Sequence, residues 1–436
     1  MNNRLNGRAW LGIVIFSLVG QIAWTMENMF YNLYIVDQFN ASSSSIALMV
    51  SLSALTATLT TLFMGALSDK IGKRKLFIIL GYILWGITIL GFIFVNNQYI
   101  ASATLGVSLV IILDCLMTFF GSTANDAAYN AYLTEITNDT NRGKVEGVNS
   151  AMPLISILIV FGGLSGFAKI QPDGTDTWYI VYVIIGAIVL ISGILGIFLI
   201  KEPQIQANSN DSYISNIFYG FKPKVVKENK ILYLILLAFA IFGISLQVFM
   251  PYYILYLQRA GIEIEFAKQI GFDSYVIIMA PAIIIAAVFT IFYGKIIDKF
   301  GFIKSLIPML IVYVIGLLLL TIFKDTIMMF FGCMLMMIGY LSATASFNYA
   351  IRNHTPINKV GLFQGIRLFA QVLIPMLLGP WIGSLICGDT NSLFGVTGEG
   401  FVVSQYIFLG AIIVLLFIVI PLLFVRKENK EERKND

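Results

Sequence analysis

Long apolar runs, separated by short polar segments, extend over the whole chain of 436 residues. A helix needs about 20 apolar residues to cross the hydrocarbon core of a bilayer. Runs of this length predict twelve membrane-spanning helices, near residues 9–36, 43–67, 76–95, 101–133, 146–168, 177–200, 231–258, 271–297, 304–323, 326–351, 360–386 and 401–425. The alternating segments of about ten residues that are typical of a membrane β-barrel are absent. The pattern therefore predicts an all-α polytopic membrane protein.

Composition excludes several functional classes. Hydrophobic residues make up 58% of the chain and charged residues only 12%, against about 25% charged in soluble domains. Cys115, Cys333 and Cys387 are scattered through the apolar runs and His354 is the one histidine, so neither a disulfide framework nor a metal site is predicted. The sequence has no G-x-x-x-x-G-K-[ST] loop, H-E-x-x-H motif or nucleophile elbow. We therefore expect neither an enzyme nor a cofactor.

Basic residues concentrate in alternate loops and at both ends of the chain, in segments 4–8, 70–75, 142–144, 201–230, 295–304, 352–359 and 426–434. Lys and Arg accumulate on the cytoplasmic side of membrane proteins. The distribution predicts a multi-pass protein of the cell membrane with both termini in the cytoplasm. The net charge of +4 reflects this asymmetry and does not indicate a nucleic-acid partner.

The longest polar interval, 201–230, divides the predicted spans into two sets of six. We expect an N-terminal half at 1–200, a cytoplasmic linker at 201–230, a C-terminal half at 231–425 and a charged tail at 426–436.

The two halves repeat a motif. The pattern G-x-x-x-D-K-x-G occurs after span 2 and again after span 8, at Gly65, Asp69, Lys70 and Gly72 and at Gly294, Asp298 and Gly301. A fainter echo links the segment from Asn130 to the segment from Asn348. Repeats across two helical halves are typical of secondary transporters, which bind substrate near the middle of the membrane. The repeat therefore favours a transporter.

The segment GALSDKIGKRK at 65–75 resembles the loop 2–3 signature of the major facilitator superfamily. A generic basic loop would explain its lysines but not its Gly–Asp–Gly spacing or the second copy. The resemblance implies two pseudo-symmetric six-helix halves that work by alternating access. It also implies that Gly65, Asp69, Lys70, Gly72 and Arg74, with the second copy, latch the halves on the cytoplasmic side rather than contact substrate.

The stretch from Asn125 to Arg142 is similar to a segment of the glycoside–pentoside–hexuronide:cation symporters, the group of the melibiose permease and its proton-coupled sucrose-transporting relatives. This resemblance places Asp126 on an aspartate of the cation site. The two helix-2 aspartates of the sodium-coupled members are missing between Ser51 and Met64, and their sugar-binding arginine has no counterpart near Asn149 to Pro153. The coupling ion is therefore expected to be a proton, with sodium as the less favoured choice.

Glu27 lies inside the first span, where a carboxylate costs roughly 2.5–3.5 kcal/mol on insertion scales. At 100° per residue, one stripe of about 120° holds Gln21, Trp24, Glu27, Asn28 and Tyr31. An aromatic face beside a carboxyl and amides suits a sugar, and we expect these five residues to bind substrate. The alternative is a carboxyl that is hydrogen-bonded to another helix and only holds the bundle together.

Two further acids lie in the fourth span. Asp114 is near mid-membrane on a face with Thr118, Asn125 and Tyr129, and Asp126 points about 120° away. Because desolvation disfavours a charged carboxyl, either acid is a candidate proton carrier, as is Glu27. The resemblance favours Asp126 for the coupling ion. We expect Asn125 and Tyr129 to contact substrate; packing against a polar neighbour is the alternative for both acids.

The C-terminal half supplies further substrate-binding candidates: Gln247, Tyr252, Asn348, Arg367 and Gln371. Spans 7 and 10 are included because the resemblance implies that spans 1, 4, 7 and 10 line the cavity. Arg367 either partners a carboxylate or anionic substrate or reaches the membrane interface. Four tyrosines have the alternative of an interfacial aromatic position: Tyr31, Tyr34, Tyr252 and Tyr256.

Taken together, the sequence predicts a secondary transporter for the proton-coupled uptake of a glycoside, such as a di- or oligosaccharide. Its expected partners are that small molecule and membrane lipid, with no obligate protein partner. Glu27 and Trp24 are expected to contact the sugar. The alternative is a proton-antiport exporter of drugs or metabolites in the same superfamily.

Overall fold

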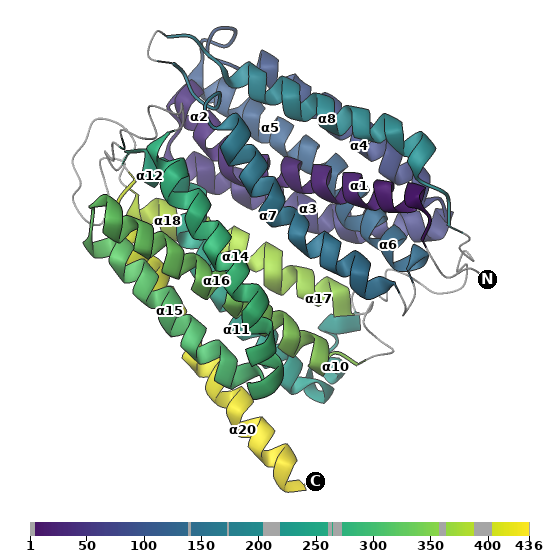
Figure 1. Cartoon of the computed structure of the whole chain (residues 1–436), viewed down its shortest axis with the longest axis vertical. Helices are drawn as coiled ribbons and strands as arrows, with labels where there is room; N and C mark the ends of the chain where they lie inside the picture. Colours follow the sequence, from purple (N-terminus) through teal and green to yellow (C-terminus); the bar gives the residue numbers. More distant parts are fainter. Residues whose placement is uncertain are drawn as a thin grey trace. The chain divides into compact units, whose positions relative to one another are not determined.

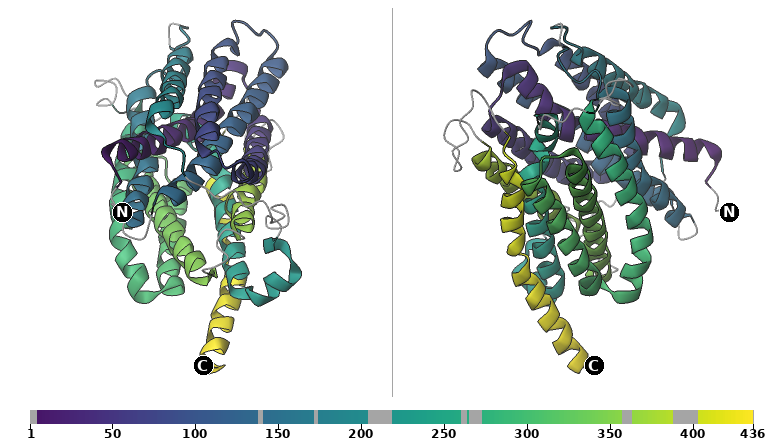
Figure 2. Two further views of the ribbon diagram at one scale, coloured as in Figure 1. Left: turned by 90° about the vertical axis from the view of Figure 1, so that its right-hand side faces the viewer. Right: turned by 60° about the vertical axis from the view of Figure 1, so that its left-hand side comes forward.

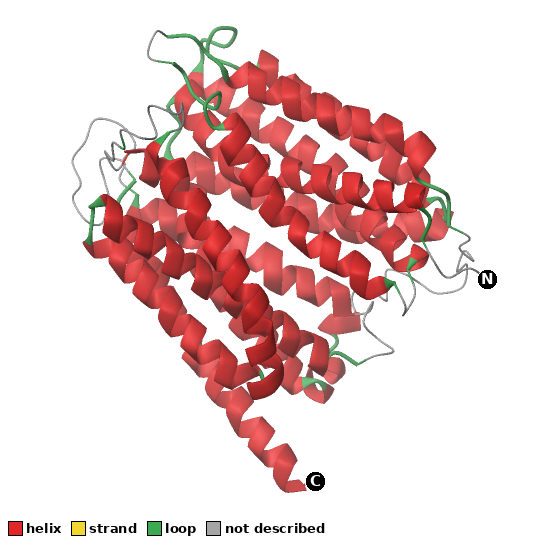
Figure 3. Cartoon of the chain, viewed as in Figure 1, coloured by secondary structure: helices red, strands yellow, loops and turns green. Residues whose placement is uncertain are grey.

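The fold is known from a computed structural model, which describes residues 5–137, 141–171, 174–203, 219–259, 264, 273–356, 363–387 and 403–435. These residues form helices joined by short loops (Figure 3). Twelve helices in this part of the chain are long and apolar enough to cross a membrane. They are Gly7–Phe39, Ser43–Ile71, Arg74–Phe94, Ala103–Ile136, Gly147–Leu164, Trp178–Leu199, Lys230–Gln258, Ser274–Phe300, Phe302–Ile322, Thr326–His354, Gly365–Ile386 and Tyr406–Glu428. The predicted all-α polytopic fold with twelve spans is confirmed.

The chain divides into two compact units, Met1–Ser45 with Leu52–Tyr213 and Ile46–Ser51 with Ile214–Asp436. The helices of the N-terminal part are α1 (Gly7–Thr25), α2 (Tyr31–Phe39), α3 (Ser43–Ile71), α4 (Arg74–Gly91), α5 (Ala103–Gly121), α6 (Asn130–Ile136), α7 (Arg142–Leu164) and α8 (Trp178–Leu199). Those of the C-terminal part are α10 (Pro223–Glu228), α11 (Lys230–Phe249), α12 (Tyr253–Arg259), α14 (Ser274–Phe300), α15 (Phe302–Ile322), α16 (Thr326–His354), α17 (Gln364–Leu368), α18 (Ile374–Ile386), α19 (Tyr406–Leu416) and α20 (Val419–Asn435) (Figure 1).

Glycines let helices approach closely within each unit. A Cβ on Gly86 of α4 would lie 2.6 Å from the backbone nitrogen of Leu190 in α8. In the second unit, a Cβ on Gly316 of α15 would lie 2.3 Å from the nitrogen of Met336 in α16. Small residues at such crossings allow the van der Waals contact that drives helix association in a bilayer. These contacts explain why glycine recurs inside apolar spans.

Four spans depart from regular α-helix at or beside their polar residues. π-Helical segments interrupt the first, fourth and eleventh spans at Met26–Phe30, Ser122–Tyr129 and Phe369–Leu373, and a 3₁₀ turn at Met250–Tyr252 interrupts the seventh. The 3₁₀ turn contains Pro251, which cannot donate the helical hydrogen bond. π-Bulges occur often at functional sites, because the extra residue re-aims the side chains around it.

The repeated motif ends a helix at a glycine with positive φ in both copies. Gly72 follows α3 with φ +68°, and Gly301 follows α14 with φ +76°. Residues with a Cβ rarely adopt positive φ, so glycine is favoured at this position in each copy.

The last helix of the second unit continues beyond its apolar run. α20 extends through the charged segment to Asn435, as the yellow helix in Figure 2 shows. Glu428 on this helix pairs with Lys230 at the start of α11.

Candidate functional site

Glu27 lies in the π-helical break of the first span and is only 8% exposed. Its Oε1 accepts hydrogen bonds from the hydroxyls of Ser53 on α3 at 2.6 Å and of Thr118 on α5 at 2.9 Å. The two hydroxyl oxygens are themselves 2.9 Å apart. Oε2 of Glu27 is buried and has no hydrogen-bond partner among the described residues. Three spans thus meet at one carboxyl that keeps an unused oxygen.

Asp114 is the second buried acid of this cluster. It is 2% exposed, it precedes Thr118 by one turn on α5, and its Oδ1 has no partner in the described part of the chain. Tyr31, one turn after Glu27, donates its hydroxyl to the sulfur of Met117 at 3.1 Å. The first span therefore runs beside α5, and Asp114 is near enough to Glu27 for their charges to interact.

Asp126 has a different environment. It belongs to the π-helical segment Ser122–Tyr129, is partly exposed, and accepts a hydrogen bond from Ser122 on its own helix at 3.0 Å. Its charge also reaches Glu27. Asp126 is thus more exposed than Asp114, from which it was expected to point away.

Two tryptophans pack beside the acid cluster. The ring centroids of Trp24 and Trp85 are 4.9 Å apart. Both rings touch the backbone at Gly121, where an added Cβ would lie 2.8 Å from Trp85 and 3.0 Å from Trp24. Trp85 is fully buried, and its indole nitrogen has no partner among the described residues. Trp24, by contrast, is partly exposed.

The structure divides the predicted stripe of the first span. Gln21 and Trp24 are partly exposed and Asn28 is exposed, whereas Glu27 and Tyr31 point into the unit. The amide of Asn28 donates to the carbonyl of Trp24 at 2.8 Å. The stripe was predicted for a regular α-helix, and the π-helical segment at 26–30 changes the phase of the residues within it.

Three predicted substrate contacts are held by hydrogen bonds inside their own units. Asn125 is buried, packs against Gly20 and donates to the hydroxyl of Tyr82 at 3.3 Å. Tyr129 donates to the carbonyl of Ile13 at 2.9 Å. Tyr252 donates to the carbonyl of Pro380 at 2.8 Å. These bonds tie neighbouring helices together.

Four tyrosines had the alternative of an interfacial position: Tyr31, Tyr34, Tyr252 and Tyr256. All four are buried within their units. Burial of this kind does not fit a belt of aromatic side chains at the lipid surface.

The second unit carries the remaining predicted contacts. Gln247 is partly exposed and Asn348 is exposed. Arg367 and Gln371 lie one turn apart, and Nε of the first and Nε2 of the second are buried without partners among the described residues. Arg367 also interacts with the charge of another cation, Arg352. The described part of the chain therefore offers these two donor groups no acceptor.

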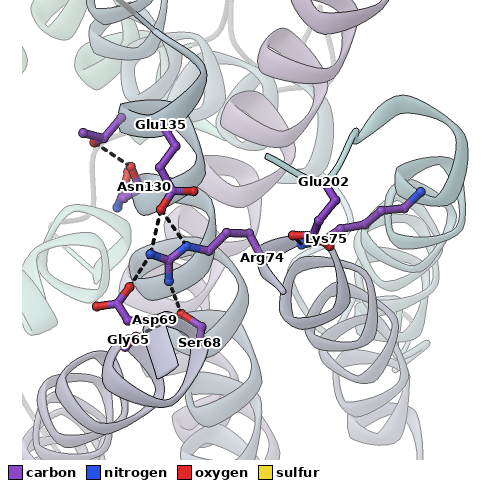
Figure 4. A network of polar contacts seen from close by, with 9 residues as sticks. Gly65, Ser68, Asp69, Arg74, Lys75, Asn130, Glu135 and Glu202 are labelled. Carbon is purple, nitrogen blue, oxygen red and sulfur yellow. Dashed lines mark hydrogen bonds and ion pairs between the residues drawn. The ribbon is translucent and has the colours of Figure 1, made fainter. Parts of the chain in front are cut away.

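The loop between the second and third spans is organised around Arg74, which is 4% exposed (Figure 4). Its guanidinium pairs with Asp69, donates to Oε1 of Glu135 at 2.7 and 3.0 Å, and donates to Oγ of Ser68 at 2.5 Å. Gly65 takes part through its carbonyl, which accepts a hydrogen bond from Ser68 at 3.0 Å. One arginine therefore joins the end of α3, the start of α4 and α6.

Lys70, by contrast, is exposed. The second copy of the motif, at Gly294–Gly301, lacks this arrangement. Asp298 is exposed and forms no ion pair with the described residues, and Ile303 occupies the position that corresponds to Arg74.

Sequence reasoning missed Ser53, Trp85 and Glu135. Ser53 carries no charge and lies among many hydroxyl residues of the second span, so no pattern distinguished it. Trp85 resembles any other aromatic residue of an apolar run. Glu135 lies in the Asn125–Arg142 stretch, where its charge at the end of the fourth span was a usable signal.

The family model of the Major Facilitator Superfamily matches residues 13–373 and 277–436 of the chain. The chain belongs to this superfamily. Members are membrane transporters and not enzymes. The predictions that the chain is a transporter and that it is not an enzyme are therefore confirmed. A search of curated proteins gave no significant match.

Solved structures support the fold of this transporter. A bacterial homolog of the human lysosomal transporter Spinster is 16% identical with a TM-score of 0.66, and the match covers 97% of each chain. A variant of the nucleoside transporter NupG is 15% identical with a TM-score of 0.72 over 94% of this chain and 99% of that chain. A D-xylose-proton symporter is 14% identical with a TM-score of 0.70 over 94% and 97%. At these identities the likeness concerns the fold alone.

Proposed function

We propose that this transporter is a symporter that takes up a glycoside together with a proton. The observation that carries the proposal is Glu27, a buried carboxyl inside a membrane span with one oxygen that has no partner among the described residues. An ionisable group at this depth is costly and is a functional candidate by default. Ser53 and Thr118 donate hydrogen bonds to Oε1 of Glu27 and not to Oε2. The alternative role, a carboxyl that only holds the helices together, therefore accounts for one oxygen and not for the other.

A glycoside fits the surface beside Glu27. Trp24 is partly exposed, and the amide side chains of Gln21 and Asn28 lie on the same span. A sugar ring presents apolar C–H faces, which pack on an aromatic ring, and hydroxyls, which bond amides and carboxyls. In the second unit the proposal extends to Gln247, Asn348, Arg367 and Gln371, which all keep some side-chain exposure or an unpartnered donor.

The resemblance of the Asn125–Arg142 stretch to the glycoside–pentoside–hexuronide:cation symporters agrees with this substrate class. Two of the structural neighbours are described as a nucleoside transporter and a D-xylose-proton symporter, whose solutes contain a sugar ring. These likenesses support the proposal only as fold-level analogy.

A proton is the proposed coupling ion. Glu27, Asp114 and Asp126 each offer a carboxyl that can bind one proton without a cage of ligands. Protonation would favour the loaded, inward-turning state, and loss of the proton to the cytoplasm would reset the carrier.

The proposal includes cytoplasmic termini and a linker at 201–230 between two six-helix halves.

The test uses de-energised cells that make the protein. A panel of glycosides is added and the external pH is followed. A glycoside that enters with protons makes the medium more alkaline, and Glu27→Gln abolishes this change. Asp325→Asn is the matched control, because Asp325 only caps α16 by accepting from the nitrogen of Met328 at 3.0 Å and asparagine caps helices equally well.

Absence of a pH change with every glycoside, despite normal amounts of protein in the membrane, would contradict proton symport. The same assay with added sodium then tests sodium coupling. Acidification of the medium on addition of an amphiphilic cation, which enters the de-energised cells in exchange for protons, would instead establish the proton antiport of the exporter.

A further inference from the structure

We propose that Glu27 and Asp114 form a single proton-binding unit, in which two carboxyls share one proton. The role of this pair in coupling proton movement to uptake rests on the proposed function. Proton sharing between the two carboxyls does not depend on the substrate. It moves the coupling role from Asp126, which the sequence favoured, to a pair that spans two helices.

The helices bring the two acids together. Thr118 bonds Glu27 at 2.9 Å, and Tyr31 bonds Met117 at 3.1 Å. These two contacts fix the register of the first span against α5, and residues four apart lie on one face of a helix. Asp114, four residues before Thr118, is therefore beside the Glu27–Tyr31 segment.

Each acid has one oxygen that needs a donor. Oε2 of Glu27 and Oδ1 of Asp114 are both buried and unpartnered among the described residues. A buried acceptor without a partner costs about 1–3 kcal/mol. A proton held by either carboxyl supplies the kind of donor that both oxygens lack.

The hydroxyls around Glu27 suit both protonation states. Ser53, Thr118 and Oε1 of Glu27 make three short contacts, but the two hydroxyls have only two hydrogens between them. Both hydrogens can point to an ionised carboxylate, or one can turn to the other hydroxyl. The hydroxyl pair can therefore adapt when a proton arrives or leaves.

No described cation compensates the pair. None of the titratable groups that interact with one or both acids can carry a positive charge. They are Tyr31, Cys115, Asp126 and Tyr182. The basic residues of α1, α3 and α4 lie at the helix ends: Arg8, Lys70, Arg74 and Lys75. At 1.5 Å per residue, Arg8 is roughly 28 Å along the helix from Glu27.

Electrostatics then requires a proton. Two ionised carboxylates close together in a buried site repel each other, and no cation of the described residues interacts with either acid. Acid pairs of this kind titrate as one unit, in which the first proton is held much more tightly than the second. Asp126 differs because it is partly exposed and bonded to Ser122.

Infrared difference spectroscopy of the purified full-length protein in lipid vesicles tests proton sharing without any substrate. The C=O stretch of a protonated carboxyl is followed while the pH is raised. In a shared pair, Glu27→Gln and Asp114→Asn each shift or remove the same titrating band. Ser108→Ala leaves it unchanged, because Ser108 is an exposed residue of α5 whose hydroxyl donates to the carbonyl of Thr104 on the same helix. Two separate bands, each lost in only one variant, would overturn the proposal.

Transport tests the coupling role. Glu27→Gln and Asp114→Asn should each abolish uphill accumulation of the glycoside while downhill exchange continues, and the double variant should be no worse than either single variant. Asp114→Glu retains a carboxyl and should restore accumulation. Recovery in this variant would show that the loss in Asp114→Asn comes from the missing carboxyl and not from misfolding. Full accumulation by Asp114→Asn, or its loss in Asp126→Asn alone, would overturn the assignment.

The two proposals fail in different ways. A shared infrared band without transport of any glycoside would contradict the proposed function and leave the proton pair intact. Glycoside symport with independent bands would contradict the proton pair and leave the proposed function intact.

Discussion

The ring of Trp24 packs against that of Trp85 with their centroids 4.9 Å apart, and the pair rests on the bare backbone of Gly121. Trp85 is fully buried and Trp24 is not, so the inner ring fixes the position of the outer one. The surface proposed for the sugar thus depends on a glycine in another span.

Gly121→Ala should disturb this surface. Its Cβ would lie 2.8 Å from Trp85 and 3.0 Å from Trp24, closer than side chains tolerate, so both rings must move. Overpacking of this kind costs about 1–3 kcal/mol. We expect a lower melting temperature and a raised KM for the glycoside.

The control is Gly162→Ala on α7, where no atom lies within 4 Å of the added Cβ. It should be neutral or slightly stabilising, since alanine is the better helix former. Equal melting temperatures and equal KM values for the two variants would refute the role of Gly121.

Arg74→Lys should impair transport although it keeps the charge. The guanidinium bonds Asp69, Ser68 and Glu135 at once, and a lysine ammonium cannot reproduce this fork. A buried hydrogen-bonding group left without its partner, as Ser68 would be, costs about 1–3 kcal/mol. We expect a large fall in kcat with substrate affinity retained, because the residues of this loop are expected to act in the conformational change and are not among the proposed sugar contacts.

Lys73→Ala, at an exposed neighbouring position, should change stability by no more than about 0.5 kcal/mol and leave transport unaltered. Glu135→Gln should reproduce part of the Arg74→Lys defect. A wild-type kcat in Arg74→Lys would show that the network is dispensable.

Thr118→Val should weaken proton coupling. The substitution keeps the shape of the side chain but removes a hydroxyl that bonds Glu27 at 2.9 Å. Loss of a hydrogen bond to a charged group costs about 1.5–3 kcal/mol, so the ionised form of Glu27 becomes harder to reach. We expect slower release of the proton, measured as a shifted pH dependence of uptake.

Ser53→Ala should act in the same direction and not additively, since both hydroxyls bond the same oxygen. Thr88→Val is the control, because its hydroxyl donates only to carbonyls of its own helix. An unchanged pH profile in the Thr118→Val and Ser53→Ala double variant would contradict the role of the hydroxyls.

The spans and the buried acids were readable from the sequence for a simple reason. Hydrophobic length alone decides whether a helix can cross a bilayer, and a charge such as Glu27 is conspicuous inside an apolar run. The motif at 65–72 was readable because glycine and aspartate have positional meanings in a tight turn.

Other features depend on tertiary contacts that one span does not encode. The π-helical segment at 26–30 shifts the phase of the first span, and no residue type announces it. Ser53 gains its role only because Glu27 lies opposite it. Asn125 was expected to face substrate, yet it packs on Gly20 and bonds Tyr82, since a wheel drawn for one helix does not show which neighbour covers each face.

The two glycines of the repeated motif should respond differently to asparagine. Gly72 has φ +68° and ψ +23°, the left-handed helical region, which asparagine tolerates. Gly301 has φ +76° and ψ 179°, a region that is essentially restricted to glycine. Gly72→Asn should therefore keep near-normal stability and transport, whereas Gly301→Asn should lose about 1–3 kcal/mol.

Alanine serves as the matched comparison at both positions, because it is strained in either region and leaves open space around the new Cβ. Melting temperatures of the four variants in the same detergent give the ranking, with Gly72→Asn closest to the wild type. If Gly301→Asn were as stable as Gly72→Asn, the second copy would not need the backbone conformation assigned to it, and its glycine would serve another purpose.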